Sequence, residues 1–573
     1  MKKIFFGKLF GLTILMFMLL FTGASAEMYE GTGLGYDKDG IVLDVEIKDS
    51  KITDVKVKRA KESEFAIPAI QEIAKKVIAT QSLDVDGISG ATITSEGTKE
   101  AIEEAVKKSG ITLTAVTGQN TKAVELPKEA DVVVIGAGGA GLTSAIAAHE
   151  KGVKVILIEK TELLGGNTNY ATAGLNAAGT KIQEKLGIKD SPELFYEDTM
   201  KGGKNKNNKE LVRVLVNNSS AIVDWLTERG ADLSELTSTG GQSAKRTHRP
   251  TGGTAVGPNI VAALSKTAES EKIDIRKGTK AIALVKAKNK IVGVKVREID
   301  GKEYTIKAKA VIVATGGFGA NAKMVEKYNP KLKGFGSTNN PAIVGDGIIM
   351  VEKVGGALVD MKEIQTHPTV VHNKTNMITE AVRGEGAILV NRDGKRFIDE
   401  LETRDVVSKA ILSQKGKSAF LIFDEDIRTK LKAADGYVKK GFAVEGTLEE
   451  IAAKIGTDAK TLEATLNKYN EAVKNKVDSE FNKKTLPKEL TGTKYYAIEV
   501  SPAVHHTMGG VRINTNAEVL GKNGRPIKGL YAAGEVTGGM HGANRIGGNA
   551  VADITVFGKI AGENAATYSK SVK

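Results

Sequence analysis

The stretch Asp131-Val-Val-Val-Ile-Gly-Ala-Gly-Gly-Ala-Gly141 decides the fold of this chain. Its run of apolar residues predicts a buried parallel strand, and the glycines after it predict a tight turn into a helix from Leu142 to Lys151. Gly136, Gly138 and Gly141 occupy the three positions of the dinucleotide-binding fingerprint. We therefore expect this turn to bind the pyrophosphate of a dinucleotide.

A second strand supports the same interpretation. Val153 to Ile158 is apolar, and it ends on Glu159, which is placed to bind a ribose hydroxyl. A lone glycine fingerprint is a weak signal, but strand, glycines, helix, strand and acid in this order are specific. They predict an α/β dinucleotide fold without choosing between NAD and FAD.

Glycine-rich strand ends recur through the rest of the chain. Gly165-Gly166-Asn167-Thr168 follows the second strand, and Val311 to Gly317 is another apolar strand that ends in glycines. Near the C-terminus, Gly529 to Glu535 is a further strand with a terminal acid. Contacts spread over the whole chain suit one long, extended FAD better than NAD.

The first 26 residues have the pattern of a secretory signal peptide. Lys2, Lys3 and Lys8 form the basic start, Leu9 to Phe21 the apolar run, and Ala24-Ser25-Ala26 the cleavage site. A retained membrane anchor is the weaker alternative, because this run falls short of the roughly 18–20 residues that a spanning helix needs. We expect cleavage after Ala26 and an exported protein, at the cell surface or secreted.

The amino-acid composition excludes several cofactors and classes of partner. The chain has no cysteine, which excludes disulfides, a lipid-acylated cysteine, a c-type haem and cysteine-ligated iron–sulfur clusters. Electrons must therefore travel on flavins or another organic carrier, and we predict no metal site. Export without disulfides suits the surface of a Gram-positive cell. The net charge of +13 is scattered and aromatic residues make up only 5%, so no nucleic-acid partner is expected.

Residues 27–115 are predicted to form a small α+β domain. Strand-like alternation through residues 43–47 and 52–57 surrounds a turn at Asp49-Ser50, and apolar residues from Ile70 to Ile78 fall at helical spacing. Residues 116–126 are polar and are expected to be a linker.

One segment of this small domain, Asp86 to Ser95, combines glycines with hydroxyl side chains. Thr94 or Ser95 is expected to cap a helix from Glu96 to Lys108, whose positive end favours an anion. A plain turn that caps a helix would look the same. However, Ser89-Gly90-Ala91-Thr92 resembles the covalent attachment motif of the FMN-binding domain family. That resemblance implies FMN joined through its phosphate to Thr92 by a flavin transferase.

From about residue 127 to 573, the chain resembles the FAD-binding succinate dehydrogenase and fumarate reductase flavoproteins, above all the soluble flavocytochrome c type of fumarate reductase. Three sets of motifs carry this resemblance: Gln365-Thr-His367-Pro; Met377 to Arg383 with Thr403-Arg404-Asp405; and His505 to Gly510 with His541 to Asn549. It implies a Rossmann-like FAD-binding domain in two parts, 127–361 and 506–573. A capping domain of α+β type, 362–505, is expected between them and closes over the substrate.

The resemblance also implies the residues that bind FAD without a covalent bond. They are Gly136, Gly138, Ala140, Gly141, Glu159, Lys160, Gly165, Gly166, Asn167, Thr168, Ala173, Gly174, Thr315, Gly316, Gly317, Asp346, Glu535, Arg545, Asn549 and Ala550.

The implied substrate is a small dicarboxylate. Arg545 and His505 would hold one carboxylate, and His367 and Thr379 the other, since charge-assisted hydrogen bonds suit these groups. The remaining substrate-binding residues implied by the resemblance are Met377, Glu380 and Gly548. In isolation, a single His or Arg is more often a structural hydrogen-bonding residue than a catalytic one.

In the family's mechanism, hydride passes from N5 of reduced FAD to one alkene carbon, and Arg404 protonates the other. A guanidinium is a poor acid, because its pKa lies above about 12. The resemblance therefore implies a relay in which Glu380 and Arg383 supply protons to Arg404.

The FMN-binding domain stands where periplasmic flavocytochromes carry haem. We expect a membrane quinol or a flavin-based export donor to reduce FMN, and electrons to pass to FAD without haem. Met377 matches the fumarate-type pocket, where related urocanate reductases carry tyrosine. Urocanate or another acrylate-type acid stays open as the substrate, as does an extracellular electron carrier without fast turnover.

Overall fold

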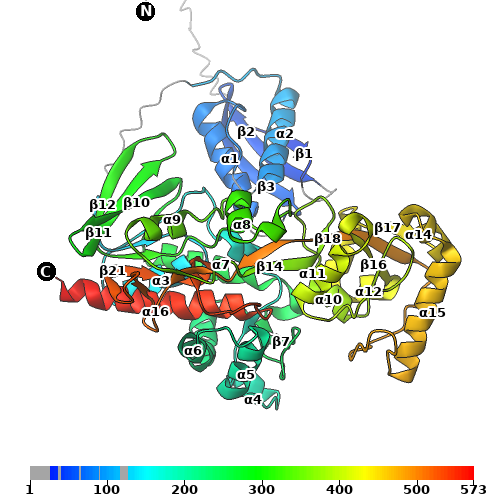
Figure 1. Cartoon of the computed structure of the whole chain (residues 1–573). Coiled ribbons are helices and arrows are strands. Elements are labelled where there is room, and N and C mark those ends of the chain that lie inside the picture. The colour runs from blue at the N-terminus through cyan, green and yellow to red at the C-terminus, as the bar shows by residue number, and fades with distance from the viewer. Residues whose placement is uncertain (1–25, 36–39, 63–65, 89–90, 117–126, 573) are drawn as a thin grey trace, which may run out of the picture.

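The computed structural model describes residues 26–35, 40–62, 66–88, 91–116 and 127–572, except the side chain of Thr92. The predicted signal peptide apart from Ala26, the predicted linker apart from residue 116, and Ser89-Gly90 lie outside these residues. Three hydrophobic cores organise the described residues into an N-terminal domain, a dinucleotide domain and a cap. Figure 1 shows the N-terminal domain above the dinucleotide domain, with the cap to one side.

The N-terminal domain packs two helices on one antiparallel sheet of β1 (Glu27–Gly33), β2 (Ile41–Lys48) and β3 (Lys51–Ala60). The predicted turn is confirmed, because Asp49 and Ser50 connect β2 to β3 with positive φ angles. The helices are α1 (Ile67–Thr80) and α2 (Thr92–Ser109). β1 and α2 approach closely at two glycines, since a Cβ on Gly33 would lie 1.8 Å from the carbonyl oxygen of Gly97.

The predicted start of the second helix was wrong. The helix α2 begins at Thr92 rather than Glu96, so Thr94 and Ser95 lie inside its first turn and cap nothing. The Ser95 hydroxyl instead donates to the carbonyl of Ala91 and accepts from the amide of Ile88, both at 2.9 Å. Hydroxyl residues suit a helix start and its first turn almost equally, which explains the error in the predicted boundary.

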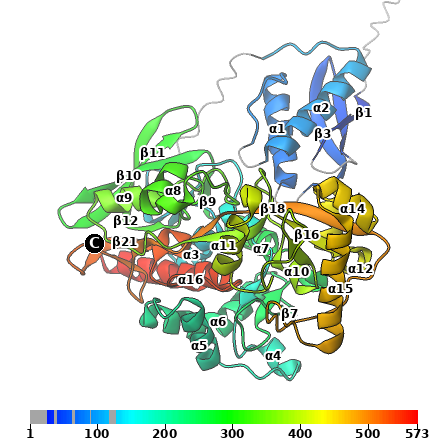
Figure 2. The ribbon, with the colours of Figure 1, turned by 45° about the vertical axis from the view of Figure 1, so that its right-hand side comes forward.

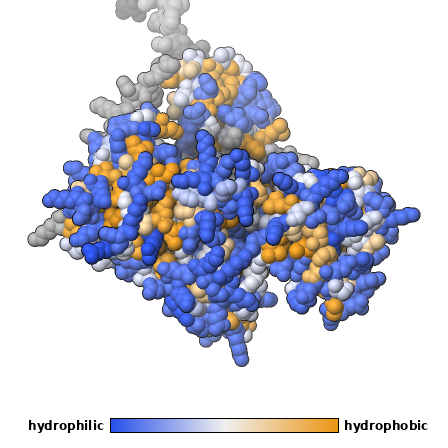
Figure 3. Space-filling view, in the orientation of Figure 1, coloured by the Kyte–Doolittle hydropathy of each residue, from blue (hydrophilic) through white to orange (hydrophobic). Residues whose placement is uncertain are grey.

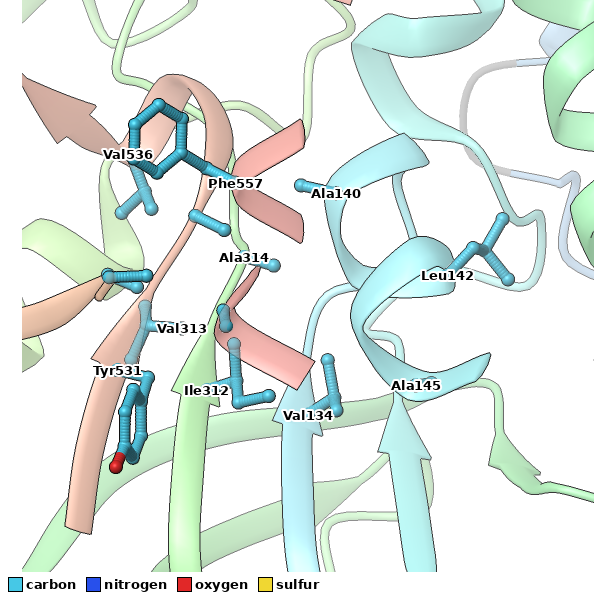
Figure 4. Close-up of a cluster of buried hydrophobic side chains, with 14 of the residues drawn as sticks. Val134, Ala140, Leu142, Ala145, Ile312, Val313, Ala314, Tyr531, Val536 and Phe557 are labelled. Carbon is cyan, nitrogen blue, oxygen red and sulfur yellow. The ribbon is translucent and has the colours of Figure 1, made fainter. Parts of the chain in front are cut away.

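The dinucleotide domain is built on an eight-stranded sheet whose centre is parallel. Its central strands are β21 (Pro526–Ala532), β12 (Glu303–Val313), β4 (Glu129–Ile135) and β5 (Val155–Ile158), in that order. The predicted apolar strands are thus confirmed. Figure 4 shows Tyr531, Ile312 and Val134 on three neighbouring strands of this core. The helices α3 (Gly139–Glu150) and α16 (Asn549–Ser571) pack against each other over the sheet.

The other elements of this domain surround that centre. Its sheet continues through β9 (Asp274–Arg276), β10 (Thr279–Ala287), β11 (Lys290–Glu298) and β20 (Glu518–Leu520). A lobe that the sequence patterns did not indicate contains β6 (Leu175–Asn176), α4 (Lys181–Lys185), α5 (Pro192–Gly202), α6 (Lys209–Glu228), β7 (Glu235–Thr237), β8 (Thr247–Arg249) and α7 (Val256–Ser270). Smaller elements are α8 (Ala322–Tyr328), α9 (Asp346–Lys353), β13 (Leu358–Val359), β19 (Gly510–Arg512) and β22 (Thr537–Gly538).

The cap is a five-stranded antiparallel sheet covered by helices, and its core extends from Val371 to Val500. The strands are β14 (Ile364–Val371), β15 (Ile388–Val390), β16 (Ala419–Asp424), β17 (Val444–Gly446) and β18 (Tyr495–Thr507). The helices are α10 (Glu380–Gly384), α11 (Arg404–Leu412), α12 (Glu425–Lys430), α13 (Lys432–Lys439), α14 (Leu448–Ile455) and α15 (Ala459–Asn475). Figure 2 shows α14 and α15 at the outer edge of the cap.

Two strands belong to both the cap and the dinucleotide domain. β14 and β18 pair with each other, and their shared end reaches the dinucleotide core, where Ile364 and Val504 pack. Their other end lies in the cap core at Val371 and Val500. The change of core therefore falls inside β14 and β18, rather than at the expected boundaries after residues 361 and 505.

The surface is largely hydrophilic, with hydrophobic residues in separate small groups on the face shown in Figure 3. Among the residues that the structure describes, no helix is both long enough and apolar enough to span a membrane.

Candidate active site

An elongated cavity lies at the carboxyl ends of the parallel strands, where dinucleotide folds bind their ligands. Gly136 follows β4, Glu159 follows β5, Ala314 follows β12 and Ala533 follows β21, and all four residues line the cavity. The same cavity continues to Met377, His505, Arg404 and Arg545 at the cap. It therefore joins the glycine-rich strand ends to a group of basic side chains.

The shape and lining of this cavity fit FAD. Gly136 and Gly165 line the cavity and have φ angles of 98° and 108°, which glycine adopts without strain. The buried hydroxyl of Thr315 has no hydrogen-bond partner among the residues that the structure describes. Most of the expected FAD contacts line the cavity: Gly136, Gly138, Ala140, Glu159, Lys160, Gly165, Gly166, Asn167, Thr168, Ala173, Gly174, Thr315, Gly316, Asp346, Glu535, Arg545 and Ala550.

Three expected FAD contacts do not line the cavity. Gly141 instead permits α3 to approach β4, because a Cβ there would lie 1.7 Å from the carbonyl oxygen of Gly136. Gly317 faces Thr507 and Glu535, and buried Asn549 bonds to Asn176 at 2.7 Å. A fingerprint position serves packing as well as ligand contact, so sequence alone does not separate these roles.

Four side chains converge at the cap end, and we call His367, Arg404, His505 and Arg545 the basic cluster. β14 carries His367, β18 carries His505, α11 begins at Arg404, and Arg545 lies between β22 and α16. The rings of His367 and His505 meet edge to face with centroids 5.3 Å apart. The register between β14 and β18 thus places two imidazoles from distant parts of the chain together.

Arg404 is held by two acceptors. Its Nε and Nη2 both donate to Oε2 of Glu380 at 3.3 Å, and its Nη1 donates to Oε1 of Gln365 at 3.3 Å. Burial raises the pKa of the Glu380 carboxyl, but the charges of Arg404 and Arg383 outweigh burial and hold the pKa below its ordinary value. Glu380 is therefore a carboxylate that orients Arg404.

Arg383 lies behind Glu380 and is completely buried. Its Nη1 donates to the backbone carbonyl of Glu400, whereas its Nε and Nη2 have no hydrogen-bond partner. Burial lowers the pKa of the Arg383 guanidinium, and the Glu380 charge opposes that shift. The three predicted relay residues are thus electrostatic neighbours, with a direct contact between Arg404 and Glu380.

The imidazoles of this site are neutral at ordinary pH. Burial lowers the pKa of His367, His505 and His506 well below the usual value for histidine, and the charge of Arg404 adds to the effect on each. Nδ1 of His367 is buried without a partner. Nδ1 of His505 lies 2.8 Å from the hydroxyl of Thr338.

Arg545 differs from an ordinary arginine in its pKa and in its hydrogen bonding. Burial and the nearby Arg404 charge lower its pKa to about 9. Its side chain is almost fully buried, and within the described part of the chain its Nε has no partner and its Nη1 donates only to the Ile546 carbonyl. A buried cation without a paired anion is unfavourable, so an anionic ligand would stabilise this arrangement.

Of the remaining expected substrate-binding residues, Met377 and Gly548 line the cavity. Thr379 caps the start of α10 by position, and its backbone amide donates to Tyr437 at 3.0 Å. His367, Thr379 and the two relay residues Glu380 and Arg383 are not among the residues that line the cavity, but His367 adjoins it through His505.

Sequence patterns missed the residues that support the basic cluster. Thr338 contacts His505, and the Gln365 amide donates to Asn544 and to the Arg545 carbonyl, both at 2.8 Å. Gln365 and Asn544 fall inside quoted motifs, which gave a weak signal. Thr338 lies in a loop without a motif, and only its tertiary contact identifies it.

Comparison with known proteins identifies the family. The model of the FAD binding domain matches residues 131–551, and that of the FMN-binding domain matches residues 35–107. A fumarate reductase (cytochrome) of Shewanella frigidimarina is 52% identical over 77% of this chain and 77% of its own length. The chain belongs to the fumarate reductase family of FAD-binding flavoproteins. It is a flavin-dependent oxidoreductase that acts on a CH–CH group.

Other relatives extend this similarity. An NADH:fumarate oxidoreductase of Klebsiella pneumoniae is 46% identical over 88% of this chain, which spans only 54% of that relative. A urocanate reductase of Eggerthella lenta is 35% identical over 96% of this chain and 93% of its own length. The open conformation of a flavocytochrome c3 fumarate reductase matches with a TM-score of 0.70 and 43% identity, over 79% of this chain and 80% of that one. The FAD-binding and FMN-binding domains indicate FAD and FMN as cofactors.

Proposed function

We propose that this chain is an exported two-flavin enzyme that reduces fumarate to succinate. The observation that carries the proposal is the basic cluster at the end of a cavity that fits FAD. Two arginines and two imidazoles gather there, and Arg545 lacks a paired anion. A small dianion with carboxylates at both ends suits such a site.

The two ends of fumarate bind to different parts of the site. Arg545, with His505, holds one carboxylate, and the interaction relieves the isolation of the buried guanidinium. His367, whose Nδ1 is unpartnered, holds the other carboxylate together with Thr379. Fixing both ends polarises the conjugated double bond between them toward charge development at one carbon.

Arg404 donates the proton. FAD held by the residues that line the cavity, and reduced by way of FMN on the N-terminal domain, would supply the hydride to one alkene carbon. Arg404 gives a proton from its guanidinium to the other carbon, and the carboxylate of Glu380, 3.3 Å away, accepts a proton and passes it on to restore Arg404. Arg383 stands behind Glu380 and supplies that proton, and solvent water reprotonates Arg383 in turn. The balance is one hydride and one proton added across the double bond, which yields succinate.

The N-terminal domain carries FMN as a phosphoester on Thr92, attached by a flavin transferase. Thr92 begins α2, where backbone amides and the helix dipole favour a phosphate. The neighbouring hydroxyls of Thr94 and Ser95 are buried and bonded, to Glu62 and Ala91 respectively. Figures 1 and 2 both show the end of α2 that begins at Thr92 directed toward the body of the molecule.

The proposed export of the enzyme determines which electron donors it can reach. A signal peptide cleaved after Ala26 would place the enzyme at the cell surface or outside the cell, in keeping with a chain that has no cysteine. The donor that we propose is a membrane quinol or a flavin-based export chain, without haem.

A second candidate substrate is urocanate or another acrylate-type acid. The urocanate reductase relative matches nearly the whole chain, N-terminal domain included, and an NADH:acrylate oxidoreductase of Vibrio harveyi is 34% identical over 94% of it. Met377 lines the cavity beside the basic cluster, which favours the smaller dicarboxylate. An electron carrier without fast turnover would have no use for so complete a cluster.

One screen separates these functions. Oxidation of a reduced dye by the FAD-loaded protein, without oxygen, is measured with fumarate, urocanate, cinnamate or buffer alone. We expect fumarate to give the fastest oxidation by a wide margin. Faster oxidation with urocanate or cinnamate would replace fumarate as the substrate, and equal rates in all four would favour the electron carrier.

A further inference from the structure

One face of α1 contacts the dinucleotide domain through two ion pairs of opposite polarity. Nζ of Lys76 lies 2.9 Å from Oε1 of Glu162, and Nζ of Lys277 lies 2.8 Å from Oε1 of Glu72. Glu72 and Lys76 are one helical turn apart, so they share a face of α1. Each domain contributes one acid and one base, an arrangement that favours a single docked position.

Apolar contacts lie between these ion pairs. Leu163, in the loop after β5, packs against the hydrophobic core of the N-terminal domain. The next residue, Leu164, packs against the core of the dinucleotide domain. Two consecutive side chains therefore anchor this loop in two different domains.

The contacted loop is the one that lines the cavity. Residues on both sides of Glu162 and Leu163 belong to its wall: Glu159, Lys160, Thr161, Gly165 and Gly166. The Thr161 hydroxyl donates to the Leu163 carbonyl at 2.7 Å, and the Thr161 carbonyl accepts from the Gly278 amide at 3.1 Å. Because Lys277 precedes Gly278, both ion pairs hold one hydrogen-bonded unit.

We propose that the N-terminal domain docks through α1 onto residues 159–165 and holds this loop in the shape that retains FAD. The glycines at the end of the loop give it little stiffness of its own, so packing from outside fixes its conformation. The proposal rests on FAD as the ligand of the cavity, but not on the identity of the substrate. FAD retention and electron entry are thereby linked through one interface.

Charge reversal of one ion pair tests the proposal on the full-length protein loaded with FAD. The variants are Lys76→Glu, Glu162→Lys and the double variant, and the readout is the rate of FAD release after dilution, followed by flavin fluorescence without substrate. We expect each single variant to release FAD about threefold to tenfold faster, as loss of a partly buried ion pair implies. The double variant, which restores the pair in reverse, should release FAD at close to the wild-type rate.

Two features make the result specific. Glu162→Lys adds a positive charge near an anionic cofactor, which by itself would slow release, so faster release there must come from lost docking. Lys107→Glu makes the same charge change on the N-terminal domain, where Lys107 pairs with Glu103 of its own helix and is 69% exposed, and should leave release unchanged.

A third variant, Leu163→Ala, removes the apolar contact without a change of charge and should also speed release. Circular dichroism checks that every variant is folded, and small-angle X-ray scattering should show a larger radius of gyration for the single variants. Wild-type release rates in Lys76→Glu and Leu163→Ala, or no rescue in the double variant, would overturn the proposal. None of these measurements involves turnover, so failure of the fumarate assignment would leave them intact.

Discussion

In the proposed mechanism, Arg404 meets two demands at the scale of a single residue, because it must reach the substrate and must also be recharged with a proton. The contact to Glu380 would serve recharging, and the contact to Gln365 fixes the direction of the guanidinium. Gln365 also bonds to Asn544 and to the backbone of Arg545, so the two arginines are oriented by one amide. Their spacing is thereby set before substrate arrives.

Replacement of Arg404 by alanine should therefore abolish turnover while FAD and fumarate still bind. General acid catalysis contributes about 10²–10⁴-fold, and loss of the charge removes further stabilisation of the transition state. Arg545→Ala is the matched comparison, and should weaken fumarate binding as well as turnover. Dye-linked kinetics, FAD content and fumarate affinity distinguish the two variants. Near-normal turnover in Arg404→Ala would show that the proton comes from another group.

The buried imidazoles predict how stability depends on pH. Each has a lowered pKa in the folded state, so the unfolded chain takes up protons that the folded chain does not as the pH falls below about 6.5. Each group then costs up to about 1.4 kcal/mol of stability per pH unit. Without substrate, the Tm should fall from pH 7 to pH 5, and it should fall less in His506→Gln. Equal losses in both proteins would show that His506 is not neutral in the fold.

Sequence indicated the reacting residues better than their supports. Arg404, Arg545, His367 and His505 lie in compact motifs, and the structure brings all four together. Thr338 has no such signal, since its role depends on a loop that returns to β18 and contacts His505. Gly141, Gly317 and Asn549 show the opposite error, in which a motif position serves packing instead of the ligand.

Among the elements, the helix α2 carries the clearest prediction. Because α2 begins at Thr92, a phosphate on that residue would face the free backbone amides of the first turn. Protein from the native host should carry one FMN adduct, and Thr92→Ala should remove it. Intact mass spectrometry of both proteins tests this expectation. No flavin-sized mass on the wild type, or an adduct that survives the substitution, would contradict it.

Elements with a strong hydrophobic pattern could be predicted from the sequence, but the residues at which they begin and end could not. The strand β5 and the C-terminal ends of β4, β12 and β21 are continuous apolar runs because they are buried on both faces, and such runs are visible in sequence. In the cap, the helices α14 and α15 follow each other closely, and they are separated where Gly456 adopts a left-handed conformation that the sequence pattern does not reveal. The short strands β6, β7 and β8 gave no signal, since they pair only through tertiary contacts.

For the whole molecule, the path of electrons separates two assays. On the proposed electron path, a small dye reaches FAD directly, whereas the physiological donor needs the flavin of the N-terminal domain. Thr92→Ala should therefore keep most of its dye-linked fumarate reduction but lose reduction driven by membranes of the native host. The ratio of the two rates, in variant and wild type, is the measurement. Equal losses in both assays would mean that FMN supports folding or the active site itself.

The strands β14 and β18 have a mechanical consequence. They are the ladder that both cores share, and their register is irregular between His367 and Val370, directly beside the basic cluster. Any swing of the cap must flex the ladder, and irregular pairing is where a ladder bends most easily. The proposed substrate spans this joint, with Arg545 on one side and the cap's His367 and Thr379 on the other. In this binding mode, a molecule with a carboxylate at each end contacts both sides of the joint and fixes the distance between the cap and the dinucleotide domain. An acid with one charged end binds one side only and leaves that distance unfixed.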